Sequence, residues 1–167
     1  DWVVEAPFAP LARLHPAVRR VIPIALRSWR SKLYSPATWR AFSNLKRDLA
    51  EAGYERVIDA QGLLKSALVA RLAKAPVSGY AKSSAREPIA TRFYDQCFHV
   101  SWQRHAVERN RQITAAALGY AADGEPDYGI HAPEPAPGAW IPPEPYVLLL
   151  TATARDEKLW PEPNWIA

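Results

Sequence analysis

The feature that most restricts the fold is an alternation of short apolar segments with longer amphipathic segments before residue 120. Four of the apolar segments are strand candidates: Val3–Val4, Val21–Ile24, Val57–Ile58 and Val77–Tyr80. Strands and helices in alternation predict a parallel sheet with right-handed crossover connections. The predicted fold class is therefore α/β.

Three helices are predicted, from Pro36 to about Gly53, from Leu63 to Lys74 and from about His105 to Leu118. Ser35 can cap the first helix, which starts with a proline, and Gly119 can end the third in a left-handed conformation. The apolar faces of the first two helices contain large residues at helical spacing: Trp39, Phe42, Leu45 and Leu49, then Leu64, Leu68 and Leu72.

Charge and proline divide the chain into unlike parts. Residues 1–115 contain 19 Lys and Arg against 9 Asp and Glu, whereas residues 116–167 contain 2 against 8. Nine of the 16 prolines follow residue 115, and most of them fall between Pro126 and Pro145, which predicts a stiff, solvated linker. The apolar run Tyr146–Leu150 then predicts a buried strand. We expect three regions: a Rossmann-like domain over residues 1–120, a linker over 121–145, and the start of a second domain over 146–167.

Composition excludes several classes of protein. One cysteine, Cys97, cannot form an internal disulfide, so a disulfide scaffold is excluded and a reducing compartment such as the cytoplasm is favoured. No run of 18 apolar residues is present, which argues against a membrane span. The chain has no methionine and opens on a strand-like run, so we expect it to be a piece of a longer protein.

Polar side chains follow the strand at Val57–Ile58, at the sheet edge where ligands bind in open α/β folds. Asp59 and Gln61 occupy the loop after the strand, and Lys65 follows in the first turn of the next helix. Alternatively, Asp59 caps that helix and Gln61 bonds loop backbone. A cation in a first helical turn opposes the helix dipole, which hints at an anionic ligand near Lys65. These three are candidate cleft residues.

Arginines occupy comparable positions elsewhere. Arg27 and Arg30 follow the strand at Val21–Ile24, and Arg86 lies in a loop of small polar residues. Guanidinium groups bind carboxylate and phosphate through paired hydrogen bonds. The alternatives are a solvated basic face and, for Arg86, an ion pair with Glu87.

The remaining signals are weaker. His105 is expected at a helix N-terminus with a backbone partner. His15, His99 and His131 have no Asp, Glu or Cys at ligand spacing, so we expect no metal site. After the apolar run, Thr153 and Lys158 could hold a nucleotide diphosphate. No Gly-x-Gly-x-x-Gly or Walker sequence accompanies them.

Four segments taken together resemble the lipopolysaccharide heptosyltransferase I family. They are Ile58–Ser66, Ala85–Pro88, His105–Arg109 and Arg155–Pro161, and their order and intervals match over nearly the whole chain. The sequence departs from the family at Thr151, where members usually have His, and at Ala154, where they usually have Thr or Ser. These departures put the hydrogen bonding of the donor loop in doubt.

The resemblance implies a GT-B glycosyltransferase with two Rossmann-like domains. It implies that this chain contains the N-terminal domain without its first strand and helix, then the linker and the first strand of the C-terminal domain. Such an enzyme moves heptose from ADP-heptose to the Kdo of Kdo2-lipid A with inversion, without a metal or cofactor, on the cytoplasmic face of the inner membrane. It implies acceptor binding by Arg27, Arg30 and Arg86 and donor binding by Thr153 and Lys158. The family's catalytic Asp precedes the segment present here, so no catalytic residue is assigned and the chain alone is expected to be inactive.

Two other functions stay open at this stage. A related heptosyltransferase that adds a later heptose would share the fold and the donor. A non-catalytic, basic nucleic-acid-binding module would also explain the charge of residues 1–115. Its aromatic residues, however, fall mainly at helix-face and strand positions, so they do not form a stacking platform with the arginines. We therefore expect no nucleic-acid partner; the sequence does not indicate an oligomeric state.

Overall fold

The computed structural model describes residues 1–32, 34–131, 134, 145–147 and 156–164, with side chains except at Arg27, Arg30, Asp156 and Glu162. The chain divides into two compact units, Asp1–His131 and Ala132–Ala167. Each unit is described by itself.

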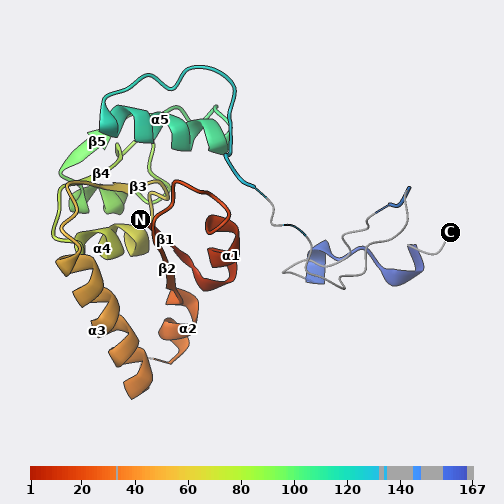
Figure 1. Ribbon diagram of the computed structural model, residues 1–167, viewed down its shortest axis with the longest axis horizontal. Helices are drawn as coiled ribbons and strands as arrows, with labels where there is room; N and C mark the ends of the chain where they lie inside the picture. Colours follow the sequence, from red (N-terminus) through yellow and green to blue (C-terminus); the bar gives the residue numbers. More distant parts are fainter. Residues whose placement is uncertain (33, 132–133, 135–144, 148–155, 165–167) are drawn as a thin grey trace. The chain divides into compact units, whose positions relative to one another are not determined.

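The first unit contains two parallel sheets (Figure 1). Their strands are β1 (Trp2–Glu5), β2 (Val21–Ile24), β3 (Val57–Asp59), β4 (Val77–Tyr80) and β5 (Gln96–Phe98). β1 pairs with β2, whereas β3, β4 and β5 form the second sheet in that order. All four predicted strands of this unit are therefore confirmed, and they are parallel as predicted. β5 was not predicted, since its Gln-Cys-Phe sequence is short and carries no strong strand signal.

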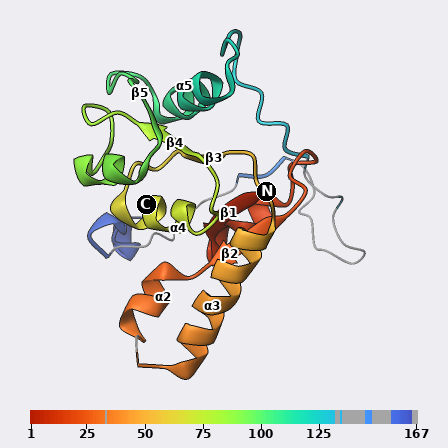
Figure 2. The same ribbon diagram turned by 90° about the vertical axis from the view of Figure 1, so that its left-hand side faces the viewer.

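Five α-helices are described: α1 (Ala9–Ala12), α2 (Leu26–Ser31), α3 (Pro36–Glu51), α4 (Leu64–Arg71) and α5 (Ala106–Leu118). Figure 2 shows α3 as the long helix that runs beside α2. The three predicted helices correspond to α3, α4 and α5. The 3₁₀ helices η1 (Ala6–Phe8) and η2 (Pro88–Phe93) complete the first unit.

Local signals explain the helix ends. Pro36 occupies the first turn of α3, where a missing N–H costs nothing, although the Ser35 side chain makes no capping hydrogen bond. Gly119 ends α5 with φ +77, as predicted, because a residue without Cβ enters this region easily. His105 is the N-cap of α5, and its Nδ1 accepts from the Val107 N–H at 3.4 Å, which confirms the expected backbone partner.

The core beside α3 combines this helix with α4 and β2. Its buried members are Ile24, Leu45, Leu49, Val69 and Ala73. The predicted apolar faces of α3 and α4 were partly wrong, because Trp39 in α3 is 60% exposed and Leu68 in α4 is 47% exposed. In α4 the small residues Ala67 and Ala70 are buried instead, which allows the helix to approach the sheet closely.

The second unit contains two described 3₁₀ turns, η3 (Asp156–Lys158) and η4 (Glu162–Asn164). Residues 148–150 of the predicted strand at Tyr146–Leu150 lie outside the described residues, as do Thr151, Thr153 and Ala154. The predicted domain boundaries stay predictions.

Candidate functional site

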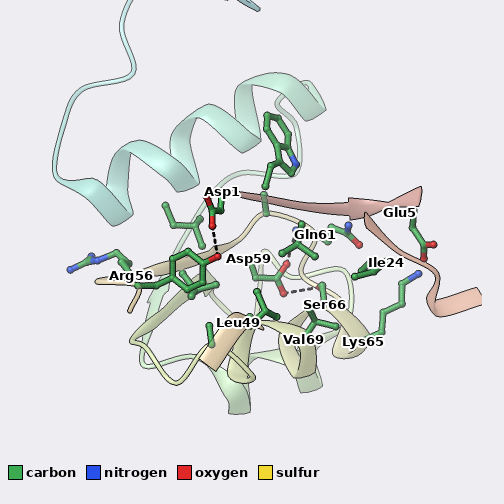
Figure 3. Close-up of a pocket in the computed structure, with 18 of the residues that line it drawn as sticks. Asp1, Glu5, Ile24, Leu49, Arg56, Asp59, Gln61, Lys65, Ser66 and Val69 are labelled. Atoms are coloured by element: carbon green, nitrogen blue, oxygen red, sulfur yellow. Dashed lines mark hydrogen bonds between the residues drawn. The ribbon is translucent and has the colours of Figure 1, made fainter. Parts of the chain in front are cut away.

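The loop after β3 is organised by Asp59. Its side chain is buried, and Oδ1 accepts hydrogen bonds from the backbone N–H groups of Gln61 (2.9 Å) and Gly62 (3.3 Å). Oδ2 accepts from Ser66 Oγ at 2.8 Å and from the Tyr94 hydroxyl at 2.6 Å. We call Asp59, Ser66 and Tyr94 the Asp59 network; Figure 3 shows the Asp59 and Ser66 side chains facing each other.

This network satisfies both carboxylate oxygens inside the protein. Burial, together with the hydrogen bond to Asp59, raises the pKa of the Tyr94 hydroxyl far above its ordinary value of 10.0. Tyr94 therefore remains a neutral donor at physiological pH. The arrangement holds the loop of residues 59–62 in place.

The N-terminus of α4 is capped by other groups. Glu87 Oε2 accepts from the Leu64 N–H at 2.7 Å, and Ser66 Oγ accepts from the Leu63 N–H at 3.2 Å. The expectation that Asp59 caps this helix is therefore wrong, because its oxygens bond the preceding loop and two side chains. Glu87 also supplies an anion at the positive end of α4, and the exposed Lys65 lies in the first turn of this helix.

Gly62 connects this loop to the loop that carries Arg86. Its φ is +66, and an added Cβ would lie 3.2 Å from the backbone N of Arg86. The Gly62 carbonyl accepts from the Glu87 N–H at 2.9 Å. Glycine at this position therefore allows the two loops to meet, which brings Arg86 close to Gln61.

Gln61 and Arg86 line a common pocket of about 160 Å³ together with Tyr80, Arg109 and Asn110. We call these five residues the arginine pocket. The Tyr80 hydroxyl donates to Asn110 Oδ1 at 3.1 Å. Burial raises the pKa of Tyr80, while the positive charges of Arg109 and Arg86 oppose that shift. One strand, two loops and one helix thus contribute to one basic site at the carboxyl ends of β3 and β4.

A larger pocket of about 490 Å³ lies between β1 and β3 (Figure 3). Asp59, Gln61 and Lys65 all line it, so the three predicted cleft residues do lie together. At its rim the Asp1 carboxylate accepts from the Tyr54 hydroxyl at 2.6 Å and pairs with Arg20 at 2.8 Å. Among the described residues, β1 and β3 each have a strand partner on one edge only.

The other predicted site residues are spread over the chain. Arg27 and Arg30 belong to α2, a helix that was not predicted, and their side chains lie outside the described part. Lys158 is the last residue of η3 and is exposed. Thr153 lies outside the described residues.

Sequence reasoning missed Tyr94, Ser66 and Arg109 as members of these clusters. A single signal was available for Arg109: its spacing from His105 places both on one face of a helix. Tyr94 carried none, because its partner, Asp59, is 35 residues away in sequence. Ser66 closes the segment Ile58–Ser66, but nothing in that segment showed that its hydroxyl would bond the Asp59 carboxylate.

Two kinds of feature are absent from the described residues. No three His, Cys, Asp or Glu side chains in the described ranges lie together as metal ligands would. No helix within those same ranges has the length and apolar character to cross a membrane.

Comparison with known proteins decides the family. Residues 42–167 match the profile of Glycosyltransferase family 9 (heptosyltransferase). The chain belongs to glycosyltransferase family 9. It is 47% identical over 173 residues to lipopolysaccharide heptosyltransferase 1 of Pseudomonas aeruginosa, covering 99% of this chain and 46% of that protein. The Salmonella typhimurium lipopolysaccharide heptosyltransferase 1 is 42% identical, with 99% and 52% covered.

Solved structures agree with the family assignment. The E. coli heptosyltransferase WaaC with ADP matches with a TM-score of 0.85 at 40% identity, covering 99% of this chain and 52% of that one. WaaC with ADP-2-deoxy-2-fluoro heptose matches with the same score and identity, covering 99% and 53%. The predicted α/β, GT-B type fold is confirmed. The chain spans about half the length of the curated relatives it matches.

Proposed function

We propose that the complete enzyme, meaning the full-length protein in which this chain occurs, transfers L-glycero-D-manno-heptose from ADP-heptose to the Kdo of Kdo2-lipid A. The reaction builds the lipopolysaccharide inner core, inverts the anomeric centre and uses no metal. The observation that carries the proposal is 47% identity to a lipopolysaccharide heptosyltransferase 1 over 99% of this chain. An ADP-heptose donor is supported by related structures that hold ADP and an ADP-heptose analogue.

The positive charge of residues 1–115 supports an anionic acceptor. Residues 1–115 carry a net charge of about +10, which attracts a polyanion at the cytoplasmic surface of the inner membrane. We assign Arg27, Arg30 and Arg86 to acceptor binding. Arg86 is exposed in the arginine pocket, and its side chain forms no hydrogen bond or ion pair with another described residue.

We do not assign Asp59 as the catalytic base. A base must reach the acceptor hydroxyl, whereas both oxygens of this buried carboxylate are occupied by protein donors. Gln61 and Lys65 remain proposed cleft residues. In keeping with the family resemblance, we assign no catalytic base within these 167 residues.

On the donor side we assign Thr153 and Lys158. The Lys158 ammonium would form charge-assisted hydrogen bonds with the diphosphate and stabilise the negative charge that develops on the leaving ADP.

The proposal is tested by measuring ADP release from ADP-heptose. The complete enzyme should release ADP with Kdo2-lipid A, and the chain of residues 1–167 alone should release none above background. Heptosylated Kdo2-lipid A serves as the competing acceptor, because an enzyme that adds a later heptose would prefer it. That preference would contradict the assignment of Kdo2-lipid A as the acceptor. Turnover by the 167-residue chain would contradict the expectation that the chain alone is inactive.

Replacing Lys158 tests the donor site. For Lys158→Ala in the complete enzyme we expect kcat/KM for ADP-heptose to fall by roughly 10- to 150-fold, equivalent to about 1.5–3 kcal/mol, with little change in acceptor KM. The matched control is Lys46→Ala on the exposed face of α3. If Lys158 only pairs with Asp156 or Glu157 at the surface, the effect stays below about 1 kcal/mol. A value within threefold of wild type would reject the role.

A further inference from the structure

The excess positive charge of residues 1–115 is concentrated in one continuous stretch of the chain. Residues 6–47 contain nine Lys and Arg and no Asp or Glu, whereas residues 48–115 contain ten Lys and Arg against seven Asp and Glu. The acid-free stretch includes β2, α2 and most of α3. Nearly all of the net positive charge therefore belongs to this part of the molecule and not to the segments that form the arginine pocket.

The helices α2 and α3 meet at one end. In both views the last turn of α2 and the first turn of α3 lie together, on the side of the first unit away from α5 (Figures 1 and 2). The Ser35 N–H donates to the Lys32 carbonyl at 3.0 Å, which ties the two helix ends. Lys32 is the C-cap of α2, Tyr34 precedes α3, and Trp39 and Arg40 lie near the start of α3. We call Lys32, Tyr34, Trp39 and Arg40 the α2–α3 tip.

The tip presents two aromatic rings and two cations to solvent. Tyr34 is fully exposed and Trp39 is 60% exposed. Lys32 and Arg40 are also exposed, and neither forms an ion pair with another described residue. Tyr and Trp are typical of membrane–water interfaces, where their rings lie at the level of the lipid headgroups. Exposed Lys and Arg are attracted by the anionic lipids of the cytoplasmic leaflet. The tip combines both signals.

The packing of α3 limits how deeply this end of the molecule can enter a bilayer. The apolar face of the helix buries Leu45 and Leu49 in the protein core, so it is not available to lipid. An interfacial amphipathic helix inserts such a face, whereas the tip can offer only its two rings and its cations. Contact with a bilayer is therefore shallow and depends on anionic headgroups.

We propose that the α2–α3 tip docks the complete enzyme on an anionic lipid bilayer, with Lys32 and Arg40 beside lipid phosphates and with Tyr34 and Trp39 among the headgroups. The choice of a bilayer over another polyanion rests on the proposed function, whose acceptor contains lipid A. None of the four residues lines the arginine pocket or the larger pocket, so this surface is separate from both.

Vesicle co-sedimentation of the complete enzyme tests the docking surface without donor or acceptor. Phosphatidylcholine and phosphatidylglycerol in a ratio of about 3 to 1 provide an anionic bilayer, and phosphatidylcholine alone provides a neutral one. We expect binding to the anionic vesicles that weakens as the salt concentration rises, and little binding to the neutral vesicles. Equal binding to both compositions would contradict the proposal.

Charge variants locate the contact. Lys32→Gln combined with Arg40→Gln removes both cations of the tip and should weaken binding to the anionic vesicles by about 5- to 30-fold. The matched control is Lys74→Gln combined with Arg92→Gln, because both are exposed cations outside the tip. The control pair should bind within about twofold of wild type. An equal loss in the two pairs would show that only the total charge matters and would overturn the assignment to the tip.

Aromatic variants test the second signal. Tyr34→Ala combined with Trp39→Ala should weaken binding by about 3- to 10-fold while the salt dependence stays close to that of wild type, because no charge is removed. Tyr34→Ala alone repeats the test if the Trp39 change impairs folding, since Tyr34 is fully exposed. Tyr128→Ala is its control, at another exposed tyrosine. Unchanged binding of Tyr34→Ala and of the double variant would reject the role of the rings.

The remaining outcomes separate the docking surface from the transferase assignment. Binding of single-stranded DNA at physiological salt, with no binding to the anionic vesicles, would overturn the docking surface in favour of a nucleic-acid partner. Vesicle binding that depends on the tip, without heptosyl transfer, would support the docking surface and overturn the proposed function. Heptosyl transfer without vesicle binding would do the reverse.

Discussion

The Asp59 network and the arginine pocket lie at the same edge of the second sheet but differ in whether the protein supplies partners for their charged groups. In the Asp59 network, four protein donors surround one buried carboxylate. In the arginine pocket, two guanidinium groups converge without any acidic neighbour among the lining residues. A charge that the protein satisfies itself stabilises the fold, whereas an unsatisfied charge favours a ligand.

This difference separates two residues that the sequence placed in equivalent positions. Asp59 and Arg86 both follow strands of a parallel sheet, where ligands bind. The hydrogen-bond partners decide which one can contact a substrate. The comparison predicts that substitutions in the Asp59 network change stability, while substitutions in the arginine pocket change acceptor use.

The largest effect is expected for Asp59→Ala. It leaves two hydroxyls and two backbone N–H groups without their acceptor, so the free energy of unfolding should fall by about 3–5 kcal/mol. Urea unfolding of the complete enzyme measures this change. Asp48→Ala is the control, because Asp48 is an exposed acid on α3 whose pairing with Arg47, at 3.6 Å, is a surface contact. Equal stability of the two variants would break the comparison.

An intermediate effect, on function only, is expected for Arg86→Ala in the complete enzyme. Loss of a charged hydrogen bond should lower acceptor kcat/KM by about 1.5–3 kcal/mol, and the same loss is expected for Arg27→Ala. The free energy of unfolding should stay within about 0.5 kcal/mol of wild type. Arg92→Ala, at an exposed position in η2, controls for general loss of positive charge. Unchanged acceptor kinetics in both variants would favour a solvated basic face.

The smallest effect is expected for Tyr94→Phe, which removes a single hydrogen bond to Asp59 and should cost about 1–2 kcal/mol. The same variant has a pH signature. The pKa of Tyr94 is raised by folding, so above about pH 10 the unfolded chain loses this proton while the folded chain keeps it, and wild-type stability falls as pH rises.

Tyr94→Phe should therefore show a shallower loss of stability in alkaline solution than wild type does. Urea unfolding measured from about pH 8 to 11 tests this slope. The control is Tyr34→Phe, since Tyr34 is fully exposed. Parallel pH profiles for wild type and Tyr94→Phe would show that Tyr94 carries no such linkage.

Local sequence signals were sufficient to predict strands β1 to β4 and helices α3 to α5. Proline in the first turn of α3 and glycine after α5 act on their own backbone, so their effect is readable without a partner. The segment Val77–Tyr80 likewise predicted a strand, and the structure shows it as β4, which is buried throughout and lies between β3 and β5. Four segments taken together, Ile58–Ser66, Ala85–Pro88, His105–Arg109 and Arg155–Pro161, were sufficient to predict the family.

Only the tertiary structure decided what the polar residues do. From the sequence, Asp59 could be a helix cap or a cleft residue. In the structure its carboxylate bonds Tyr94, 35 positions away, and the cap of α4 comes from Glu87, 23 positions beyond Leu64. From the sequence, Arg109 is an ordinary helix residue. In the structure its guanidinium stacks on the Trp102 ring and donates to the Ser84 carbonyl. The role of a polar side chain depends on which donors, acceptors and charges surround it, and for these residues chain folding brings distant segments together to supply them.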